Sequence, residues 1–177
     1  MNIAIIGGAG FIGNRLSFRL NDSQIDHTIF DKNKSISYKK FLYLDIENTK
    51  LFSKIKGYDT IIHLAAEHRD NIKPISRYDD VNIQGSVNVC KAARKYGINK
   101  IIFTSSVAIY GFADANTDEN GAPKYFNDYG RTKYEAEKIF KKWQMEDEKN
   151  RTLIIVRPTV VFGEGNRGYV YNLFNQI

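Results

Sequence analysis

The chain has 177 residues, of which 42% are hydrophobic and 26% are charged, which is typical of one soluble globular domain with a sizeable core. No apolar run reaches the roughly 18 residues that a membrane-spanning helix needs, and the N-terminal "MNIAIIGG" lacks the pattern of a signal peptide. Cys90 is the only cysteine, so an internal disulfide is excluded. The sequence therefore predicts a reducing, cytoplasmic location.

The formal net charge is +6, and a basic balance can indicate a nucleic-acid or membrane partner. The lysines are scattered, however, with small clusters at 32–40 and 141–142, and no arginine-rich stripe with interleaved aromatic residues is present. We interpret the charge as a lysine-rich solvated surface with a mild attraction for phosphate-bearing small molecules. We expect neither a nucleic-acid nor a membrane partner.

Short β-branched runs alternate with longer amphipathic stretches. In chain order, the pattern predicts a strand at 3–6, a helix at 11–21, strands at 27–31 and 41–46, a short helix at 49–57, a strand at 59–66, a long helix at 78–97, a strand at 100–106, a long helix at 128–147 and a strand at 152–158. Strands that are apolar on both faces and separated by helices predict a parallel sheet covered on both sides. The fold class is therefore α/β, with a Rossmann-type doubly wound sheet that binds nucleotides.

The first turn of this pattern is rich in glycine. "GGAGFIG" places Gly7, Gly10 and Gly13 between the first strand and the first helix, which is the context of a dinucleotide-binding turn. Gly7 permits a tight turn, Gly10 lets the backbone approach a pyrophosphate, and Gly13 lets the helix pack close to the sheet. The pyrophosphate would lie at the helix N-terminus, where free amides and the helix dipole favour negative charge.

Two acidic residues follow at the ends of strands. Asp31 lies about 20 residues past the glycines, where a carboxylate can accept hydrogen bonds from ribose hydroxyls. Its charge would repel a 2′-phosphate, so we expect NAD and not NADP; Lys32 and Lys34 weaken this preference without reversing it. Asp45 and Ile46 are candidates to flank the adenine, and for Asp45 a helix-capping role explains the residue equally well.

A tyrosine and a lysine stand four residues apart in "YGRTK", residues 129–133. Alone, this spacing is compatible with an ordinary amphipathic helix. Positions i and i+4 share a helix face, so both side chains can point into one crevice beside Thr104, Ser105 and Ser106 at the end of a strand. A free tyrosine has a pKa of about 10, and a nearby ammonium lowers that pKa. The pair can then act as a general base or acid near neutral pH.

These motifs resemble the extended short-chain dehydrogenase/reductase family over nearly the whole chain. In order they are "GGAGFIG", Asp31, "HLAA" at 63–66, Asn82, "TSSVAIYG" at 104–111, "YGRTK" and "RPTVVFGEGN" at 157–166. The chain is most similar to the nucleotide-sugar epimerase and dehydratase members, such as UDP-galactose 4-epimerase. The resemblance implies NAD as cofactor, a nucleotide-sugar substrate, a homodimer through the helices at 78–97 and 128–147, and a role in surface polysaccharide synthesis.

The resemblance also implies roles for individual residues. Ser106, Tyr129 and Lys133 match the catalytic triad: Tyr129 would take a proton from a sugar hydroxyl while the C4 hydride passes to NAD and then returns to the opposite face of a 4-keto sugar. The cofactor-binding residues would be Gly7, Gly10, Phe11, Ile12, Gly13, Asp31, Asp45, Ile46, Leu64, Ala65, Ala66, Asn82, Thr104, Ser105, Tyr129, Lys133, Pro158 and Val160. The candidates for substrate binding are Ser106, His68 and Arg69, although a solvated loop explains the last two equally well. No metal site is expected.

Two departures from the family pattern narrow the prediction. Dehydratases of the family carry an Asp-Glu pair directly after the catalytic hydroxyl residue; Val107 and Ala108 stand there and cannot transfer a proton, so an epimerase or a keto-sugar reductase remains. Family members also continue well beyond Ile177. Residues 1–160 would form the NAD-binding domain, and 161–177, whose end has helical spacing, would start a C-terminal substrate subdomain that is mostly absent.

Three interpretations of the function follow. The first is an NAD-dependent epimerase, or keto-sugar reductase, that acts at C4 of a nucleotide sugar such as a UDP-hexose. The second is a non-catalytic NAD-binding fragment or interaction module, which the short C-terminus suggests. The third, nucleic-acid binding, rests on the positive charge alone and predicts salt-sensitive binding. We expect the first.

Overall fold

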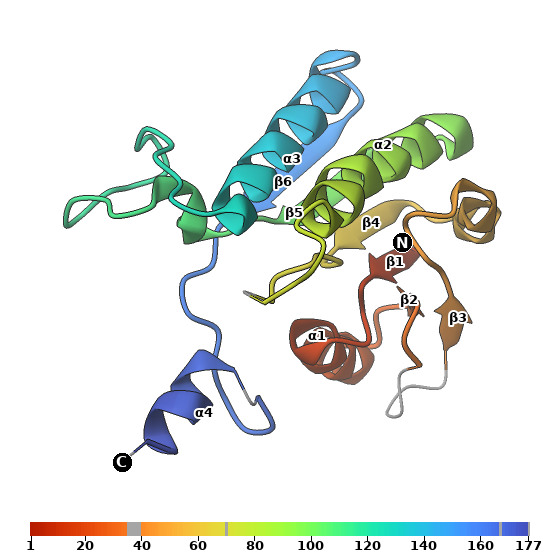
Figure 1. The fold of residues 1–177 in the computed structure, drawn as a ribbon. Coiled ribbons are helices and arrows are strands. Elements are labelled where there is room, and N and C mark those ends of the chain that lie inside the picture. The colour runs from red at the N-terminus through yellow and green to blue at the C-terminus, as the bar shows by residue number, and fades with distance from the viewer. Residues whose placement is uncertain (35–39, 70, 167, 177) are drawn as a thin grey trace.

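A computed structural model describes residues 1–34, 40–69, 71–166 and 168–176 of the chain. Its centre is a six-stranded sheet in the order β3-β2-β1-β4-β5-β6, in which the paired strands run parallel. The strands are β1 (Ile3–Ile6), β2 (His27–Asp31), β3 (Phe41–Tyr43), β4 (Thr60–His63), β5 (Lys100–Thr104) and β6 (Thr152–Val156). The predicted parallel α/β sheet is confirmed (Figure 1).

The strand order reverses at β1. The chain runs outward from β1 through β2 to β3, and then crosses back to place β4 on the other side of β1. Ile3 of β1 therefore pairs with His27 of β2 and with Thr60 of β4. In doubly wound sheets, ligands bind outside the carboxyl ends of the strands at such a reversal. The topology thus places the candidate site at the ends of β1 and β4.

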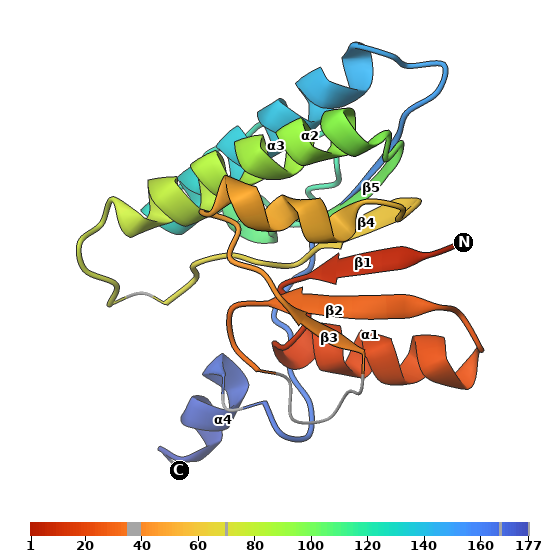
Figure 2. The ribbon, with the colours of Figure 1, turned by 90° about the vertical axis from the view of Figure 1, so that its right-hand side faces the viewer.

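Helices cover the two faces of the sheet unequally. The helices α2 (Gly85–Tyr96) and α3 (Asp128–Met145) lie side by side on one face with the 3₁₀ helix η1 (Thr49–Ile55), and α1 (Phe11–Asp22) lies on the other (Figure 2). The larger core lies beneath α2 and α3, and its largest fully buried side chains are Trp143, Phe30, Phe103 and Phe140. The smaller cluster, on the α1 side, is built on Ile3, Ile5 and Ile62.

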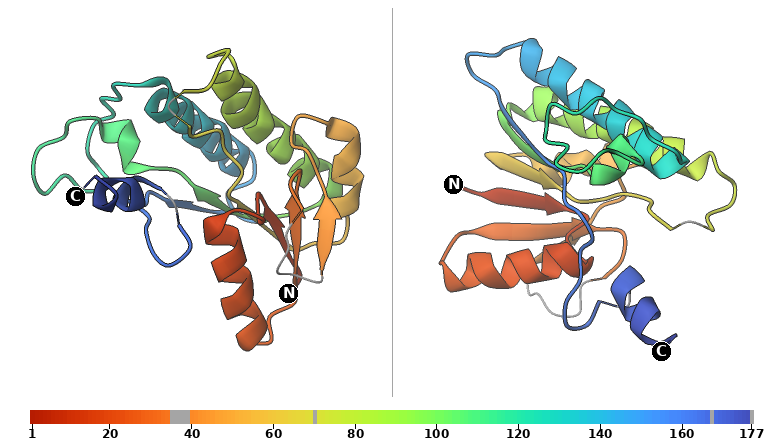
Figure 3. Two further views of the ribbon diagram at one scale, coloured as in Figure 1. Left: turned by 60° about the horizontal axis from the view of Figure 1, so that its bottom comes forward. Right: turned by 90° about the vertical axis from the view of Figure 1, so that its left-hand side faces the viewer.

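The prediction that both faces are covered is wrong for both edge strands: Leu42 and Tyr43 of β3 are exposed, and β6 is covered on one face only. Its side chains alternate: Leu153 and Ile155 pack against the larger core, whereas Ile154 and Val156 on the other face are 50% and 44% exposed. The cause is the position of α1, which contacts β2 and lies far from β6 in the second view of Figure 3.

Several predicted boundaries shift by a few residues. β3, β4, β5 and β6 end two or three residues earlier than predicted, although the residue directly after β3, β4 and β5 still donates one backbone hydrogen bond to the neighbouring strand. The predicted helix at 78–97 is a π-helical turn, η2 (Asp79–Gln84), followed by α2, which ends at Gly97 with a φ of 68° as predicted. The 3₁₀ helix η3 (Val107–Tyr110) was not predicted.

The last described element is the short helix α4 (Tyr169–Phe174), where the sequence has helical spacing. It lies toward the carboxyl ends of the strands, beyond the sheet (Figure 2). Leu173 and Phe174 are exposed. Within the described ranges, no helix combines the length and the apolar composition that crossing a bilayer requires.

Candidate active site

A cleft of about 1030 Å³ opens at the carboxyl ends of the strands. Every residue predicted to bind cofactor or substrate lines it, except Asn82. The cleft has further lining residues that the sequence did not single out: Asn33, Leu44, Glu47, Glu67, Val81, Phe126, Thr159, Val161 and Asn166. Most of these directly follow a strand or flank a predicted residue, so the rule that strand ends carry ligand contacts would have found them.

The glycine-rich turn forms one wall of the cleft. Gly7 has a φ of +80°, and a Cβ there would lie 2.3 Å from the backbone nitrogen of Ala65, so only glycine fits this turn. A Cβ on Gly13 would lie 2.4 Å from the carbonyl oxygen of Gly8. The predicted tight turn is confirmed, and Gly13 lets α1 pack closely against the turn residue Gly8 that follows β1. Gly10 begins α1 without a side-chain cap, so amides of the first turn remain for an anionic ligand.

Asp31 is held against this turn. One of its carboxylate oxygens accepts a hydrogen bond from the backbone nitrogen of Ala9 at 3.0 Å, and the other accepts from that of Asn33 at 2.8 Å. The carboxylate therefore stabilises the glycine turn and its own turn after β2. A carboxylate oxygen can accept a second hydrogen bond, so this arrangement still suits a ribose hydroxyl.

Asp45 lines the cleft and caps no helix. It accepts from the backbone nitrogen of Glu47 at 3.0 Å. The cap of η1 is Asn48, whose side chain accepts from the backbone nitrogen of Lys50. The helix-capping interpretation of Asp45 is therefore wrong, and a place beside the adenine stays a prediction for Asp45 and Ile46.

The three residues of the predicted triad meet in the cleft. Ser106 follows β5 and caps η3, where its hydroxyl accepts from the backbone nitrogen of Ala108 at 3.1 Å. Tyr129 and Lys133 lie one turn apart near the start of α3. Gly130 lets α3 approach η3, because a Cβ there would lie 2.4 Å from the carbonyl oxygen of Ala108.

The protonation of the pair differs from the prediction. Burial raises the pKa of the Tyr129 phenol above its ordinary value; a hydrogen bond with Ser106 opposes this shift and Tyr78 adds to it. Burial also lowers the pKa of Lys133 to about 7, against a smaller opposing effect of Glu137. The expected lysine-lowered tyrosine pKa is therefore wrong for this structure, because desolvation dominates both groups.

Lys133 is turned toward the sheet, which explains its weak effect on the phenol. The side chain is buried, its Nζ donates a hydrogen bond to the backbone carbonyl of Thr104, and it lies 4.4 Å from the centroid of the Phe103 ring. His63 stacks on the same ring at 5.7 Å. Burial is the main cause that lowers the pKa of His63 to about 3, and the charge of Lys133 adds a smaller effect in the same direction. The imidazole is therefore neutral at neutral pH.

Asn82 lies behind the cleft wall and supports it. Its side-chain oxygen accepts from the backbone nitrogen of Glu67 at 2.8 Å, and its amide donates to the Glu67 carbonyl and to the Thr132 hydroxyl, each at 3.0 Å. The side chain is buried and joins the segment after β4 to α3, and a contact of Asn82 with the cofactor stays a prediction.

The charged segment after β4 is partly neutralised. The Arg69 guanidinium donates to both carboxylate oxygens of Glu67, at 3.1 and 3.2 Å, and Arg69 lowers the pKa of Glu67 despite its burial. His68 and Arg69 line the cleft and are exposed. A contact with substrate stays a prediction for both.

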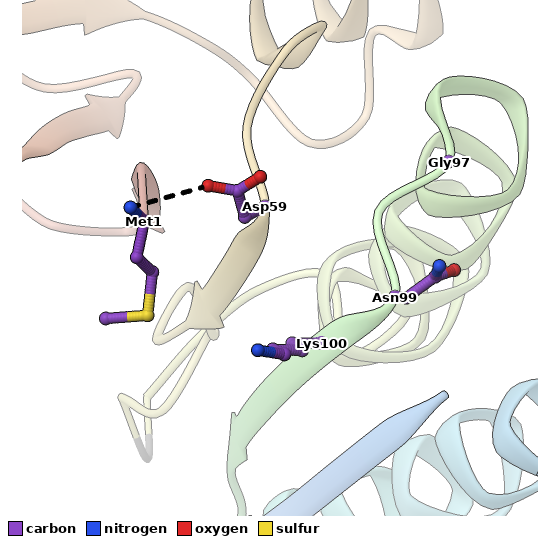
Figure 4. Close-up of a pocket in the computed structure, with 5 residues that line it drawn as sticks. All are labelled: Met1, Asp59, Gly97, Asn99 and Lys100. Carbon is purple, nitrogen blue, oxygen red and sulfur yellow. Dashed lines mark ion pairs between the residues drawn. The ribbon is translucent and has the colours of Figure 1, made fainter. Parts of the chain in front are cut away.

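Elsewhere in the described residues, a second pocket and a buried cysteine are the remaining candidate sites. A second, shallower pocket of about 340 Å³ lies at the amino ends of the strands, where the Met1 amino group faces Asp59 at 3.9 Å (Figure 4). Cys90 is buried, and burial raises the pKa of its thiol to about 12. Among the described residues, no cluster of His, Cys, Asp or Glu suits a metal ion.

Known proteins match the chain over most of its length. The model of the "NAD dependent epimerase/dehydratase family" matches residues 3–176. The N-acetyl-alpha-D-glucosaminyl-diphospho-ditrans,octacis-undecaprenol 4-epimerase of Escherichia coli O157:H7 is 44% identical over 180 residues, or 99% of this chain and 54% of the relative. A putative UDP-glucose 4-epimerase of Methanocaldococcus jannaschii is 34% identical over 151 residues, or 78% of this chain and 50% of the relative.

Solved structures share the fold. MoeE5, in complex with UDP-glucose and NAD, matches with a TM-score of 0.86 and 25% identity over 94% of this chain and 57% of its own. A UDP-galactose 4-epimerase matches with a TM-score of 0.88 and 25% identity over 99% of this chain and 62% of its own. The chain thus spans about half the length of the curated relatives it matches.

Proposed function

Because the chain belongs to the NAD dependent epimerase/dehydratase family, we propose that it is the cofactor-binding part of an enzyme that epimerises a diphosphate-linked hexose at C4. The observation that carries the proposal is the meeting of Ser106, Tyr129 and Lys133 in one cleft with the glycine-rich turn. The relatives named as 4-epimerases support the reaction.

The cleft fits NAD. Its wall includes Gly7, the uncapped start of α1 and Asp31, which suit a pyrophosphate and a ribose hydroxyl. MoeE5 and the UDP-glucose 4-epimerase of Brucella ovis have been crystallised with NAD. Bound NAD would supply a hydride acceptor and donor.

The protein groups would handle the proton. At neutral pH the buried Tyr129 phenol is protonated, the form that donates to a ketone oxygen. Lys133, with a pKa of about 7, exists in both forms there. Its ammonium is turned toward the Thr104 carbonyl in this structure, and it would stabilise a phenolate only after turning toward the phenol; its amine can take a proton. The Ser106 hydroxyl, which interacts with the phenol, would hold the sugar oxygen in line.

Val107 and Ala108 begin η3 directly after Ser106. Neither side chain can carry a proton, so the elimination of water would find no acid or base there. We therefore favour epimerisation over dehydration.

The substrate carrier has two candidates. The expected one is a nucleotide, as in the UDP-glucose 4-epimerases among the relatives. The second is a polyprenol, and the observation that favours it is the 44% identity to the epimerase of a diphospho-undecaprenol-linked sugar. Both carriers present a diphosphate, for which His68 and Arg69 at the cleft are the candidate contacts. Either substrate would fit a role in polysaccharide synthesis in the cytoplasm.

The test incubates the NAD-saturated chain with UDP-glucose, UDP-N-acetylglucosamine and N-acetylglucosaminyl-diphospho-polyprenol, and separates the sugars by chromatography. A C4 epimer from the wild type that Tyr129→Phe does not form supports the proposal. Binding of NAD without conversion of any of the three sugars supports the alternative, a non-catalytic NAD-binding module.

The division into residues 1–160 and 161–177 and the homodimer remain proposals. Met145 is the one large apolar side chain of α2 and α3 that is strongly exposed in the described chain, which gives a dimer through these helices little support. Sedimentation equilibrium tests the dimer: a monomer at all concentrations would exclude it for this chain.

A further inference from the structure

A buried ion pair stands one helical turn behind the candidate catalytic pair. Glu137 follows Lys133 by four residues on α3, and its side chain is 0% exposed. Arg157, just past β6, donates from Nε and Nη2 to the two carboxylate oxygens of Glu137 at 2.8 and 2.7 Å. Two parallel charge-assisted hydrogen bonds fix both position and orientation.

Arg157 holds two further segments. Its Nη1 donates to the Tyr110 hydroxyl at the end of η3 and to the backbone carbonyl of Glu119, the latter at 2.9 Å. The guanidinium also lies 5.3 Å from the centroid of the Tyr110 ring. One side chain therefore joins the end of β6 to α3, to η3 and to the irregular segment that precedes α3.

The backbone on both sides of Arg157 holds the segment that carries Ser106. The backbone nitrogen of Ser105 donates to the carbonyl of Val156 at 2.7 Å, and that of Val107 donates to the carbonyl of Pro158 at 3.2 Å. A shift of Arg157 would therefore move the residues on either side of Ser106.

We propose that Glu137 and Arg157 are positioning residues of the candidate active site. Their ion pair holds Ser106 against the helix that carries Tyr129 and Lys133, and it places a negative charge one turn from the lysine amine. The proposal rests on the proposed function, because its purpose is the geometry of that triad.

The charge of Glu137 acts on Lys133 inside a desolvated site. Among the described residues, His63 at the end of β4 and Glu137 on α3 interact electrostatically with the amine. Arg157 after β6 and Lys141 on α3 act through Glu137, and the Lys141 amine lies 3.9 Å from its carboxylate. His63 is neutral, with a pKa of about 3. Burial would raise the pKa of Glu137, but the hydrogen bonds of Arg157 keep it below its ordinary value. Glu137 is thus the nearby negative charge that favours protonation of Lys133.

The test reads the Lys133 amine directly in the 177-residue chain. Lysine Nζ and Cε NMR signals are followed against pH in the wild type, in Glu137→Gln and in Glu137→Asp, with Lys133→Arg to assign the signal. Glu137→Gln should lower the pKa of Lys133 by about one unit, because it removes the negative charge and keeps the shape. Glu137→Asp keeps the charge and should restore the wild-type value.

The control is Glu146→Gln. Glu146 follows α3 and is paired with Arg94 and Arg151 at 2.6 and 2.8 Å, far along the helix from the cleft. Losing this pair should leave the pKa of Lys133 unchanged. An unchanged Lys133 pKa in Glu137→Gln as well would overturn the proposal.

A double variant separates positioning from simple stability. Glu137→Met with Arg157→Met replaces the pair by apolar groups, which often restores stability. We expect the melting temperature of the double variant to recover relative to Arg157→Met alone. The pKa of Lys133 should stay below its wild-type value, as in Glu137→Gln, and the pH optimum of epimerisation should stay different from that of the wild type. Recovery of all three would mean a purely structural role and would contradict the proposal. The NMR arm needs no turnover, so a chain that fails to epimerise sinks the proposed function while the effect of Glu137 on Lys133 is still measured.

Discussion

Lys133 carries its amine at a place where a positive charge is costly. The residue is 3% exposed, lies over Phe103 and has a pKa of about 7. An ammonium loses hydration energy on burial, and one hydrogen bond to the Thr104 carbonyl replaces little of it. Such a residue reduces stability, which is common for residues kept for function.

The lowered pKa fixes how stability depends on pH. The folded-state pKa is about 7 and the ordinary value is 10.5, so between these values the unfolded chain binds more protons than the folded chain. The free energy of unfolding should therefore rise with pH across this window, as far as Lys133 is concerned.

We expect Lys133→Met to remove that slope. At pH 7 the variant should unfold with a free energy about 1–3 kcal/mol higher than the wild type, because it avoids the cost of burying the amine, which is protonated in the unfolded chain. The difference should shrink toward pH 10, where the amine of the unfolded chain also begins to lose its proton. Urea unfolding at pH 7, 8.5 and 10 measures it. A wild type that is equally stable at all three pH values, with no gain in the variant, would show that the amine is not desolvated.

Residue identities at the site could be predicted, but their protonation could not. The spacing of Tyr129 and Lys133 indicated a shared helix face, and both line one cleft. The direction of the tyrosine pKa shift depends on burial and on whether the amine faces the phenol or the Thr104 carbonyl. The burial of the phenol and the direction of the amine are set by the packing of α3 against β5, which the local sequence pattern does not specify.

At the scale of elements, the contact between α3 and η3 sets the catalytic geometry. Gly130 lies against the Ala108 carbonyl, and Ser106 caps η3. The short helix η3 was missed because its four residues, "VAIY", have no periodicity of their own. The π-helical turn η2 was missed for a similar reason: a change in helical hydrogen bonding leaves the apolar pattern of 78–97 nearly unaltered.

Gly130→Ala tests this contact. Alanine favours a helix over glycine by about 1 kcal/mol, yet the new Cβ would lie 2.4 Å from the backbone oxygen of Ala108. We expect a loss of about 1–3 kcal/mol in the free energy of unfolding, because rigid backbone must move, and a loss of epimerisation.

Gly85→Ala is the matched control. The Cβ there would meet the terminal methyl carbon of the Ile46 side chain at 2.5 Å, which can rotate away. The cost should stay below about 1 kcal/mol. Equal costs in the two variants, measured by thermal unfolding, would refute the claim that α3 is pressed against η3.

At the scale of the whole molecule, the sheet was predictable and its covering was not. Six apolar strands separated by helices indicated the parallel order, which is confirmed. The same apolar runs indicated burial on both faces, but the outward face of β6 is half exposed at Ile154 and Val156. The sequence shows which strand residues are apolar. Whether a helix covers them depends on the position of α1, which lies over β2 and not over β6 (Figure 3).

The alternation along β6 predicts opposite outcomes for neighbouring residues. Ile154→Lys places the charge on the exposed face, so the free energy of unfolding should change by less than about 1 kcal/mol. Ile155 packs against the larger core. Ile155→Lys should therefore lower the free energy of unfolding by several kcal/mol or prevent folding, because it buries an unpaired ammonium. Chemical unfolding of both variants measures the difference, and similar losses would mean that the face of Ile154 is covered in solution.

The most direct test of the account is calorimetric titration of the 177-residue chain with NAD and NADP, in the wild type and in Asp31→Asn. The account predicts that NAD binds, at least about tenfold more tightly than NADP, a difference of about 1.4 kcal/mol. Asp31→Asn should narrow that ratio by removing the charge that repels a 2′-phosphate. Failure of the wild type to bind NAD, or equal binding of the two nucleotides, would contradict the claim that the glycine-rich turn and Asp31 form an NAD site.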